Sequence, residues 1–108
     1  MSKLFTEPLV SIIVRTCNRP FLLSRALESI LAQTYPCIEV VLVDDGRYKI
    51  NPALRSFFQA KTDLNIISTG QVGRSAAGNI GIRHAKGTFI IFLDDDDTLY
   101  PDHVRILV

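Results

Sequence analysis

The amino-acid sequence predicts an α/β protein with a parallel β-sheet, helices on both faces of the sheet and the strand order 3-2-1-4. Short apolar runs rich in Val, Ile and Leu alternate along the chain with segments whose apolar residues recur at helical spacing. Right-handed connections between parallel strands then place helices on both sides. A length of 108 residues, 47% of them hydrophobic, is enough for one domain with its own core.

The first half of the chain supplies two strands and one helix. Leu9 to Val14 is a short, β-rich apolar run of the kind that forms a strand buried on both faces. Pro20 begins a segment with apolar residues at helical spacing, and this helix stops before Pro36 because proline does not continue a helix. Ile38 to Val43 is the second apolar run and predicts the second strand.

The next segment repeats this alternation. Pro52 to Ala60 predicts a helix, and Leu64 to Ile67 predicts the third strand. In that helix we expect Leu54, Phe57 and Phe58 to point inward.

The last third of the chain supplies a helix, a strand and the start of another helix. Ser75 is the expected N-cap of a helix over Ala76 to Ala85, whose small residues allow a close approach to the sheet or to a ligand. Phe89 to Leu93 predicts the fourth strand. A last helix is expected to begin near Pro101, and the chain stops inside it.

Four consecutive aspartates, Asp94 to Asp97, follow the fourth strand directly. Two carboxylates about 5 Å apart repel by roughly 3 kcal/mol at an effective dielectric of about 20, so the block must protonate, spread into water or bind a cation. Hard oxygen ligands suit Mg²⁺ or Mn²⁺. In an extended chain Asp94 and Asp96 share one side but lie roughly 6.5 Å apart, so they meet at one metal only if the chain curls after Leu93. Alternatively, one carboxylate holds a metal and another a ligand hydroxyl, or the block is a solvated loop.

The polar clusters of the chain are expected on one rim of the sheet. Sheets of this kind bind ligands outside the carboxyl ends of their strands, where the winding reverses. With the order 3-2-1-4, the reversal falls between strands one and four. The loops Arg15 to Arg19 and Asp94 to Asp97 meet there, and the pair Asp44-Asp45 ends the neighbouring second strand. A solvated acidic loop does not predict this convergence.

Composition argues against several classes of function. A formal net charge of +1 with scattered basic residues offers no face for nucleic acid. No apolar stretch approaches the roughly 20 residues that span a bilayer, and Met1 to Pro8 has no secretory h-region. A cytoplasmic protein is therefore expected, at the cytoplasmic face of the membrane if the full-length protein acts there. We expect Cys17 and Cys37 to be free thiols and His84 and His103 to be satisfied or solvated.

Several motifs follow one another along residues 8 to 104, in an order and spacing that carry a family resemblance. They are Val10-Ser11-Ile12-Ile13-Val14-Arg15-Thr16-Cys17-Asn18-Arg19-Pro20, Leu31-Ala32-Gln33-Thr34-Tyr35, Val43-Asp44-Asp45-Gly46, the stretch Gly73 to Gly81, and Leu93-Asp94-Asp95-Asp96-Asp97. Together they resemble the N-terminal half of a family 2 glycosyltransferase with the Rossmann-like GT-A fold. The resemblance covers almost the whole chain.

The resemblance implies that a sugar is transferred from a nucleotide diphosphate donor with inversion at the anomeric carbon. It implies a metal ligand at Asp96, with Mn²⁺ or Mg²⁺ as cofactor, and a ribose contact at Asp94 or Asp95. A divalent cation neutralises the charge that develops on a diphosphate leaving group, which agrees with these roles. Asp45 is implied to hold the base. The residues implied beside base and ribose are Thr16, Cys17 and Asn18.

The chain departs from the usual family pattern at three positions. Arg15 stands where proline is common, and Cys17 stands where an aromatic residue often packs on the base. Gly78 stands where an arginine often precedes Asn79. Arg74, near the start of the third helix, either restores a positive charge near the phosphates or is an exposed arginine at a helix start.

The resemblance also implies parts that lie outside this chain. Family members continue beyond the acidic motif with the acceptor site and the catalytic base, so the base is expected beyond Val108 and the fragment is expected to be inactive alone. The acceptor is implied to be a glycan or a lipid-linked molecule. The alternative is a non-catalytic nucleotide-binding module. A receiver domain needs an acidic pair after strand one, and a nucleotidyltransferase needs a glycine-rich loop there; this chain has Arg15-Thr16 instead.

An edge strand leads to one further expectation. In the order 3-2-1-4 the fourth strand has a free edge, and free edges template pairing with other chains. We therefore expect the isolated chain to self-associate through Phe89 to Leu93 or through the helix near Pro101.

Overall fold

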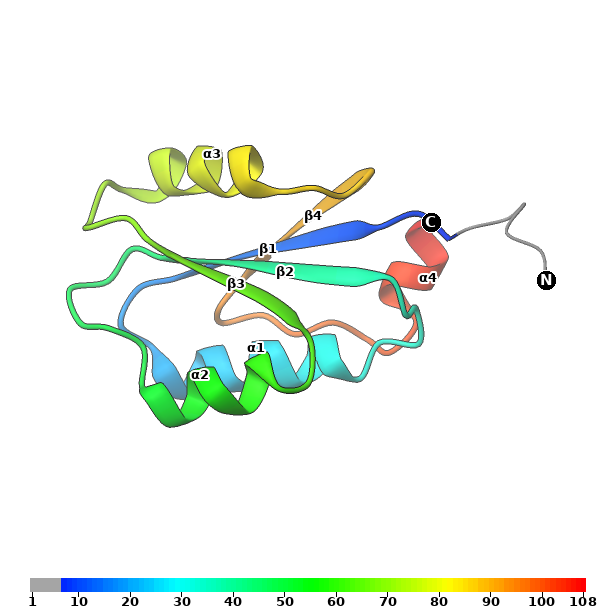
Figure 1. The fold of residues 1–108 in the computed structure, drawn as a ribbon, viewed down its shortest axis with the longest axis horizontal. Coiled ribbons are helices and arrows are strands. Elements are labelled where there is room, and N and C mark those ends of the chain that lie inside the picture. Colours follow the sequence, from blue (N-terminus) through cyan, green and yellow to red (C-terminus); the bar gives the residue numbers. More distant parts are fainter. Residues whose placement is uncertain (1–6) are drawn as a thin grey trace.

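The fold is a four-stranded parallel sheet with helices on both faces (Figure 1). The computed structural model describes residues 7–108. Its strand order, β3-β2-β1-β4, confirms the predicted order. The strands are β1 (Val10–Thr16), β2 (Ile38–Asp44), β3 (Asp63–Ser68) and β4 (Phe89–Asp94).

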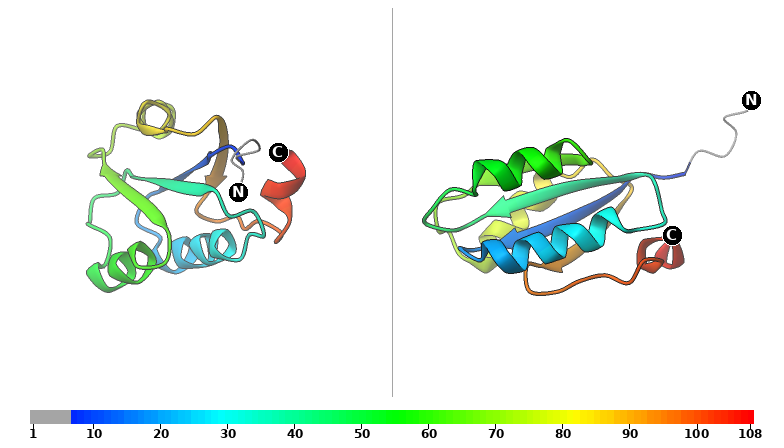
Figure 2. Two further views of the ribbon diagram at one scale, coloured as in Figure 1. Left: turned by 45° about the vertical axis from the view of Figure 1, so that its right-hand side comes forward. Right: turned by 90° about the horizontal axis from the view of Figure 1, so that it is seen from below.

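The helices form one layer on each side of the sheet. Two helices, α1 and α2, lie together on one face, and α3 lies alone on the other (Figures 1 and 2). The short α4 follows the segment that leaves β4. The helices are α1 (Pro20–Leu31), α2 (Pro52–Gln59), α3 (Arg74–His84) and α4 (His103–Leu107).

Alternation of side chains along the strands divides the interior into two cores. On one face, Ile12 of β1 belongs to a core that includes Leu27 of α1 and Phe58 of α2. On the other face, Ile13 belongs to a smaller core that includes Ala77 of α3. Because β1 and β2 are covered on both faces, their sequences are nearly continuous runs of apolar residues.

The central strands end level with one another. Thr16 of β1 pairs with Asp44 of β2, and Arg15 pairs with Asp94 of β4. The loops that follow these strands therefore emerge side by side at the carboxyl edge of the sheet. This is the edge at which the sequence places its polar clusters.

The predicted inward position of Phe57 is wrong. Its side chain is 50% exposed, whereas Phe58 is buried. Leu54 and Phe58 lie four residues apart on one face of α2, and Phe57 is turned away from that face by about 100°. Phe57 instead packs edge-on against the Phe58 ring, and the Lys61 ammonium lies 4.9 Å from its ring centroid.

The boundaries of two helices also differ from the prediction. Gly73, not Ser75, is the N-cap of α3, and its carbonyl accepts a hydrogen bond from the Ala77 N–H at 2.9 Å. Gly73 has φ 98°, a conformation that glycine adopts without steric cost. The last helix begins at His103, and Pro101 lies in the turn that precedes it.

Strand β4 forms one edge of the sheet, as expected. Its aromatic residues Phe89 and Phe92 are 45% and 58% exposed. Self-association through this edge stays a prediction.

Gly81 sets how closely α3 approaches the sheet, and its replacement gives a first prediction. A methyl group at Gly81 would lie 2.6 Å from Ile13 Cγ2 and 3.1 Å from Val43 Cγ2. At Gly78 the nearest atom, Phe92 Cε1, would be 3.9 Å away. We expect Gly81→Ala to lower the free energy of unfolding by about 1–3 kcal/mol through overpacking. The matched variant Gly78→Ala should be neutral or stabilising by up to about 1 kcal/mol, because alanine favours the helix. Urea denaturation compares them, and equal stability would contradict this account of the packing.

Candidate functional site

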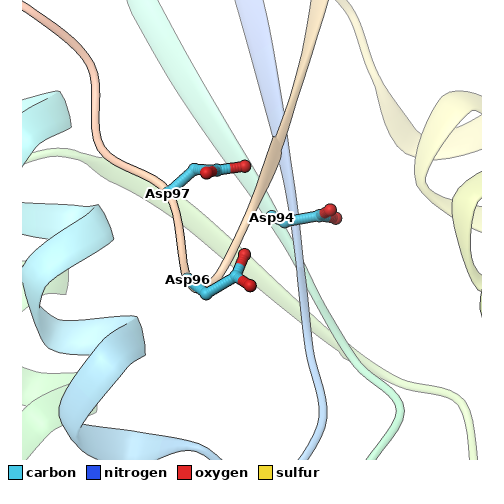
Figure 3. A group of neighbouring side chains, drawn as sticks. All are labelled: Asp94, Asp96 and Asp97. Carbon is cyan, nitrogen blue, oxygen red and sulfur yellow. The ribbon is translucent and has the colours of Figure 1, made fainter.

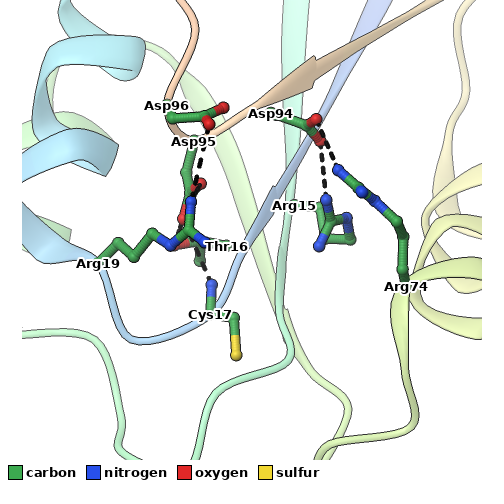
Figure 4. A network of polar contacts seen from close by, with 8 residues as sticks. All are labelled: Arg15, Thr16, Cys17, Arg19, Arg74, Asp94, Asp95 and Asp96. Carbon is green, nitrogen blue, oxygen red and sulfur yellow. Dashed lines mark hydrogen bonds and ion pairs between the residues drawn. The ribbon is translucent and has the colours of Figure 1, made fainter.

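Asp94, the last residue of β4, is held between two arginines on the α3 side of the sheet (Figure 4). Arg15, its register partner in β1, places Nη2 3.0 Å from Asp94 Oδ1. Arg74, the first residue of α3, places Nη2 2.8 Å from Asp94 Oδ2. Each carboxylate oxygen therefore accepts a hydrogen bond from a different guanidinium group. The Arg15 side chain is only 22% exposed, whereas that of Arg74 is 70% exposed.

Asp95 faces the opposite side of the sheet and is buried. Its Oδ2 accepts hydrogen bonds from Thr16 Oγ1 at 2.8 Å and from the Cys17 backbone N–H at 3.4 Å. The guanidinium of Arg19 lies 3.5 Å from Asp95 Oδ1 (Figure 4). Asp95 therefore ties the loop after β1 to the end of β4.

A tight turn then brings the remaining aspartates back toward Asp94. The Asp97 N–H donates to the Asp94 carbonyl at 3.0 Å, so the chain curls directly after β4. As a result, one carboxylate oxygen from each of Asp94, Asp96 and Asp97 lies within 4.8 Å of the others (Figure 3). Oxygens bound to one Mg²⁺ or Ca²⁺ ion at roughly 2.0–2.6 Å lie within about 5 Å of one another. The three carboxylates thus have the chemistry and spacing to hold a hard divalent cation.

A pocket of about 340 Å³ opens among these charged groups. Its wall contains three guanidinium groups and three carboxylates, so positive and negative charges nearly balance. The lining residues are Arg15, Cys17, Arg19, Arg74, Asp94, Asp95 and Asp96.

Asp45 organises the loop that leads into α3. The buried carboxylate accepts hydrogen bonds from Thr69 Oγ1 at 2.5 Å, the Val72 N–H at 2.8 Å and the Gly73 N–H at 3.0 Å. Burial raises the pKa of Asp45, but these hydrogen bonds to the ionised form together outweigh it, and the pKa lies below its usual value. Asp45 is therefore a charged anchor for the loop after β3.

Asp44 and Asn18 lie beside a second pocket, of about 350 Å³, next to the start of α1. Burial, reinforced by the charge of Asp45, raises the pKa of Asp44 although its carboxylate accepts the Gly46 N–H at 3.0 Å. Asn18 has φ 56°, packs against Gly46, and accepts the Tyr48 N–H at 3.2 Å. These contacts join the loops that follow β1 and β2.

The end of α1 fixes the segment beyond the acidic turn. Gln33 donates from Nε2 to the Tyr100 carbonyl at 2.7 Å and accepts the Val104 N–H at 3.0 Å. The Thr34 N–H donates to the Pro101 carbonyl at 2.9 Å. The Gln-Thr pair in the sequence thus holds the chain that carries the aspartates against α1.

The structure brings most of the predicted site residues together, but not all of them. Asn18 lines the second pocket, and the Asp45 carboxylate lies under the loop that it holds. The sequence did not predict the ion pairs that Arg15 and Arg19 form with the aspartates. It also did not predict that the Asp97 carboxylate lies near that of Asp94. Alternation along β1 was an available signal for Arg15, because it puts this residue on the α3 side. The predicted residues that line the first pocket are Cys17, Arg74, Asp94, Asp95 and Asp96. Thr16 lines the second pocket, and its hydroxyl donates to Asp95.

The fold and the site define a parallel α/β domain whose charged pocket lies where the winding of the sheet reverses. The family model described as Glycosyl transferase family 2 matches residues 11–108. The chain belongs to this family, and its fold is GT-A.

Several known proteins that match the chain are much longer than it is. The succinoglycan biosynthesis protein ExoO of Rhizobium meliloti is 37% identical over 101 residues, which cover 94% of this chain and 29% of ExoO. The structure of S. aureus TarS 1-349 in complex with UDP has a TM-score of 0.80 at 25% identity, over 92% of this chain and 30% of that one. The mannosyltransferase PcManGT from Pyrobaculum calidifontis, in complex with GDP-Man and Mn²⁺, has a TM-score of 0.79 at 27% identity, over 94% and 31%. The chain thus spans less than a third of the length of each of these three proteins. Within residues 7–108, no helix has the length and apolar character needed to cross a membrane.

Proposed function

We propose that this chain is the donor-binding part of an inverting, metal-dependent glycosyltransferase that uses a nucleotide diphosphate sugar. The observation that carries the proposal is the convergence of three carboxylates and two arginines at the carboxyl edge of the sheet. A divalent cation needs the carboxylates, and a diphosphate needs positive charge beside them. The acceptor, a glycan or a lipid-linked molecule, and the catalytic base belong to parts of the enzyme beyond this chain.

The cation is assigned to Asp96, with Asp94 and Asp97 close enough to share it. When bound, Mn²⁺ or Mg²⁺ stabilises the negative charge of the diphosphate leaving group. Asp96 is the natural first ligand because its side chain is 53% exposed at the turn, whereas Asp95 is buried and bonded to the loop after β1. The mannosyltransferase PcManGT, which was solved with Mn²⁺, supports a divalent metal at this kind of site.

The nucleotide is assigned to the pocket and the loops around it. Arg74 supplies positive charge for the phosphates, and Asp94 or Asp95 supplies an acceptor toward the ribose. Asp45 is assigned to the base, because its backbone N–H donates to the Thr16 carbonyl at 2.9 Å and the residue therefore lies beside the loop assigned to base and ribose. The loop residues assigned to base and ribose are Thr16, Cys17 and Asn18. The TarS structure in complex with UDP and the PcManGT structure in complex with GDP-Man support a nucleotide ligand without choosing its base.

Calorimetry with UDP and GDP in the presence of Mn²⁺ tests the proposal. We expect saturable binding of at least one of them with Mn²⁺, weakened about tenfold or more by excess EDTA, because the cation neutralises the diphosphate. UMP and GMP, which lack the second phosphate, are the matched ligand controls and should show little dependence on Mn²⁺. The absence of any binding heat at millimolar ligand, from protein with a folded circular dichroism spectrum, would refute the assignment of this site.

A further inference from the structure

The pocket at the carboxyl edge is already neutralised by its own side chains. Arg15 and Arg74 share Asp94, and the Arg19 guanidinium lies 3.5 Å from Asp95 and 3.8 Å from Asp96. A cation that binds Asp94 must therefore compete with two guanidinium groups. An anion that binds Arg74 must replace Asp94 as its ion-pair partner.

We propose that Arg74 is an exchange residue, which neutralises Asp94 in the absence of metal and moves to the diphosphate when a divalent cation replaces it. The inference rests on the proposed function and deepens it, because it makes metal and nucleotide binding interdependent through one side chain. Arg74 loses the ion pair with Asp94 and gains one with the diphosphate, so its guanidinium group is paired with an anion in both states.

Arg74 has the position and the freedom for this movement. It is the first residue of α3, where the N–H groups of the first turn and the helix dipole favour anions. Its side chain is 70% exposed, so few contacts hold it on Asp94. Gly78 lies one turn later on the same face of α3 and has no side chain to block it. A space of about 330 Å³ lined by Arg74, Gly78 and Phe92, among others, lies beside Asp94.

Arg15, unlike Arg74, is held in place by its surroundings. It projects from a strand paired on both sides, and its side chain is largely buried. It stands in direct register with Asp94, so its bond to Oδ1 follows from the sheet itself. Arg15 is therefore the positioning residue that keeps Asp94 oriented while Arg74 exchanges.

Replacement of Arg74 by Met should have opposite effects on the two ligands. Binding of Mn²⁺ alone should tighten about two- to fivefold, since an exposed ion pair that competes with the metal is removed. The factor by which UDP or GDP enhances Mn²⁺ binding should fall by at least the same amount. Arg74→Lys keeps the charge and should restore the wild-type pattern. The free Mn²⁺ signal in electron paramagnetic resonance, titrated with and without nucleotide, measures both quantities.

Arg83→Met is the matched control. It removes the same charge from the same helix, but roughly 13 Å further along the axis, beyond the screening length of about 8 Å at physiological salt. It should leave Mn²⁺ binding unchanged. Unchanged or weaker binding of Mn²⁺ to Arg74→Met, including no binding at all, would overturn the exchange, as would equal effects of the two substitutions. If neither UDP nor GDP binds to any variant, the proposed function fails, while the effect of Arg74→Met on Mn²⁺ alone still decides whether Arg74 competes with the metal.

Discussion

Replacement of Asp45 by Ala is expected to lower the free energy of unfolding by about 3–5 kcal/mol at pH 7. The change removes the acceptor of three hydrogen bonds and leaves the N–H groups of Val72 and Gly73 without it, beside the start of α3. A loosened loop also frees Arg74, which is the next residue after Gly73 in the sequence. Urea denaturation followed by circular dichroism measures the loss. A stability within about 0.5 kcal/mol of wild type would show that water replaces the carboxylate at little cost.

The pH dependence of this effect has a definite sign. The folded state lowers the pKa of Asp45, so the ionised carboxylate stabilises the fold above its unfolded pKa of about 3.9. This stability is lost as the pH falls through the lower folded value. The difference between wild type and Asp45→Asn should therefore shrink below about pH 4. Asp44→Asn is the matched control with the opposite sign, because burial raises the pKa of Asp44 and ionisation opposes folding there. It should be neutral or stabilising at pH 7.

Replacement of Asp96 by Asn is expected to weaken Mn²⁺ binding tenfold or more, which corresponds to about 1.4 kcal/mol. The amide oxygen is a neutral and weaker ligand for a hard cation than a carboxylate. Because Asp96 is exposed at the turn, the substitution should leave the urea midpoint almost unchanged. Electron paramagnetic resonance of free Mn²⁺ measures the affinity.

The neighbouring Asp95 gives a sharp comparison. Asp95→Asn keeps the shape of the side chain but weakens the hydrogen bonds from Thr16 and Cys17. It should therefore lower the stability of the fold, and it should change the Mn²⁺ affinity far less than Asp96→Asn does. An unchanged Mn²⁺ affinity in Asp96→Asn would move the metal to Asp94 and Asp97. Asp94 is a poor first choice for such a test, because its removal also frees Arg15 and Arg74.

Several features of this protein were determined by its sequence alone. Apolar runs and helical periodicity are local signals, and the right-handed connection rule turns their order into one sheet topology. The strand order, the two helical layers and the convergence of the polar loops on the carboxyl edge were predicted in this way and are observed. The family motifs were readable for a similar reason, since each of them is a short continuous stretch of the sequence.

Only the tertiary structure decided how the charged side chains pair. Arg15 and Asp94 are 79 residues apart in the chain, and their contact depends on the exact register of β1 with β4. The turn that returns Asp96 and Asp97 toward Asp94 depends on one backbone hydrogen bond that no periodicity encodes. Periodicity and connection rules place elements only to within a few residues, whereas a one-residue shift in a strand turns every side chain to the other face. The fold could therefore be predicted from local patterns, but the partners within the site required the packed structure.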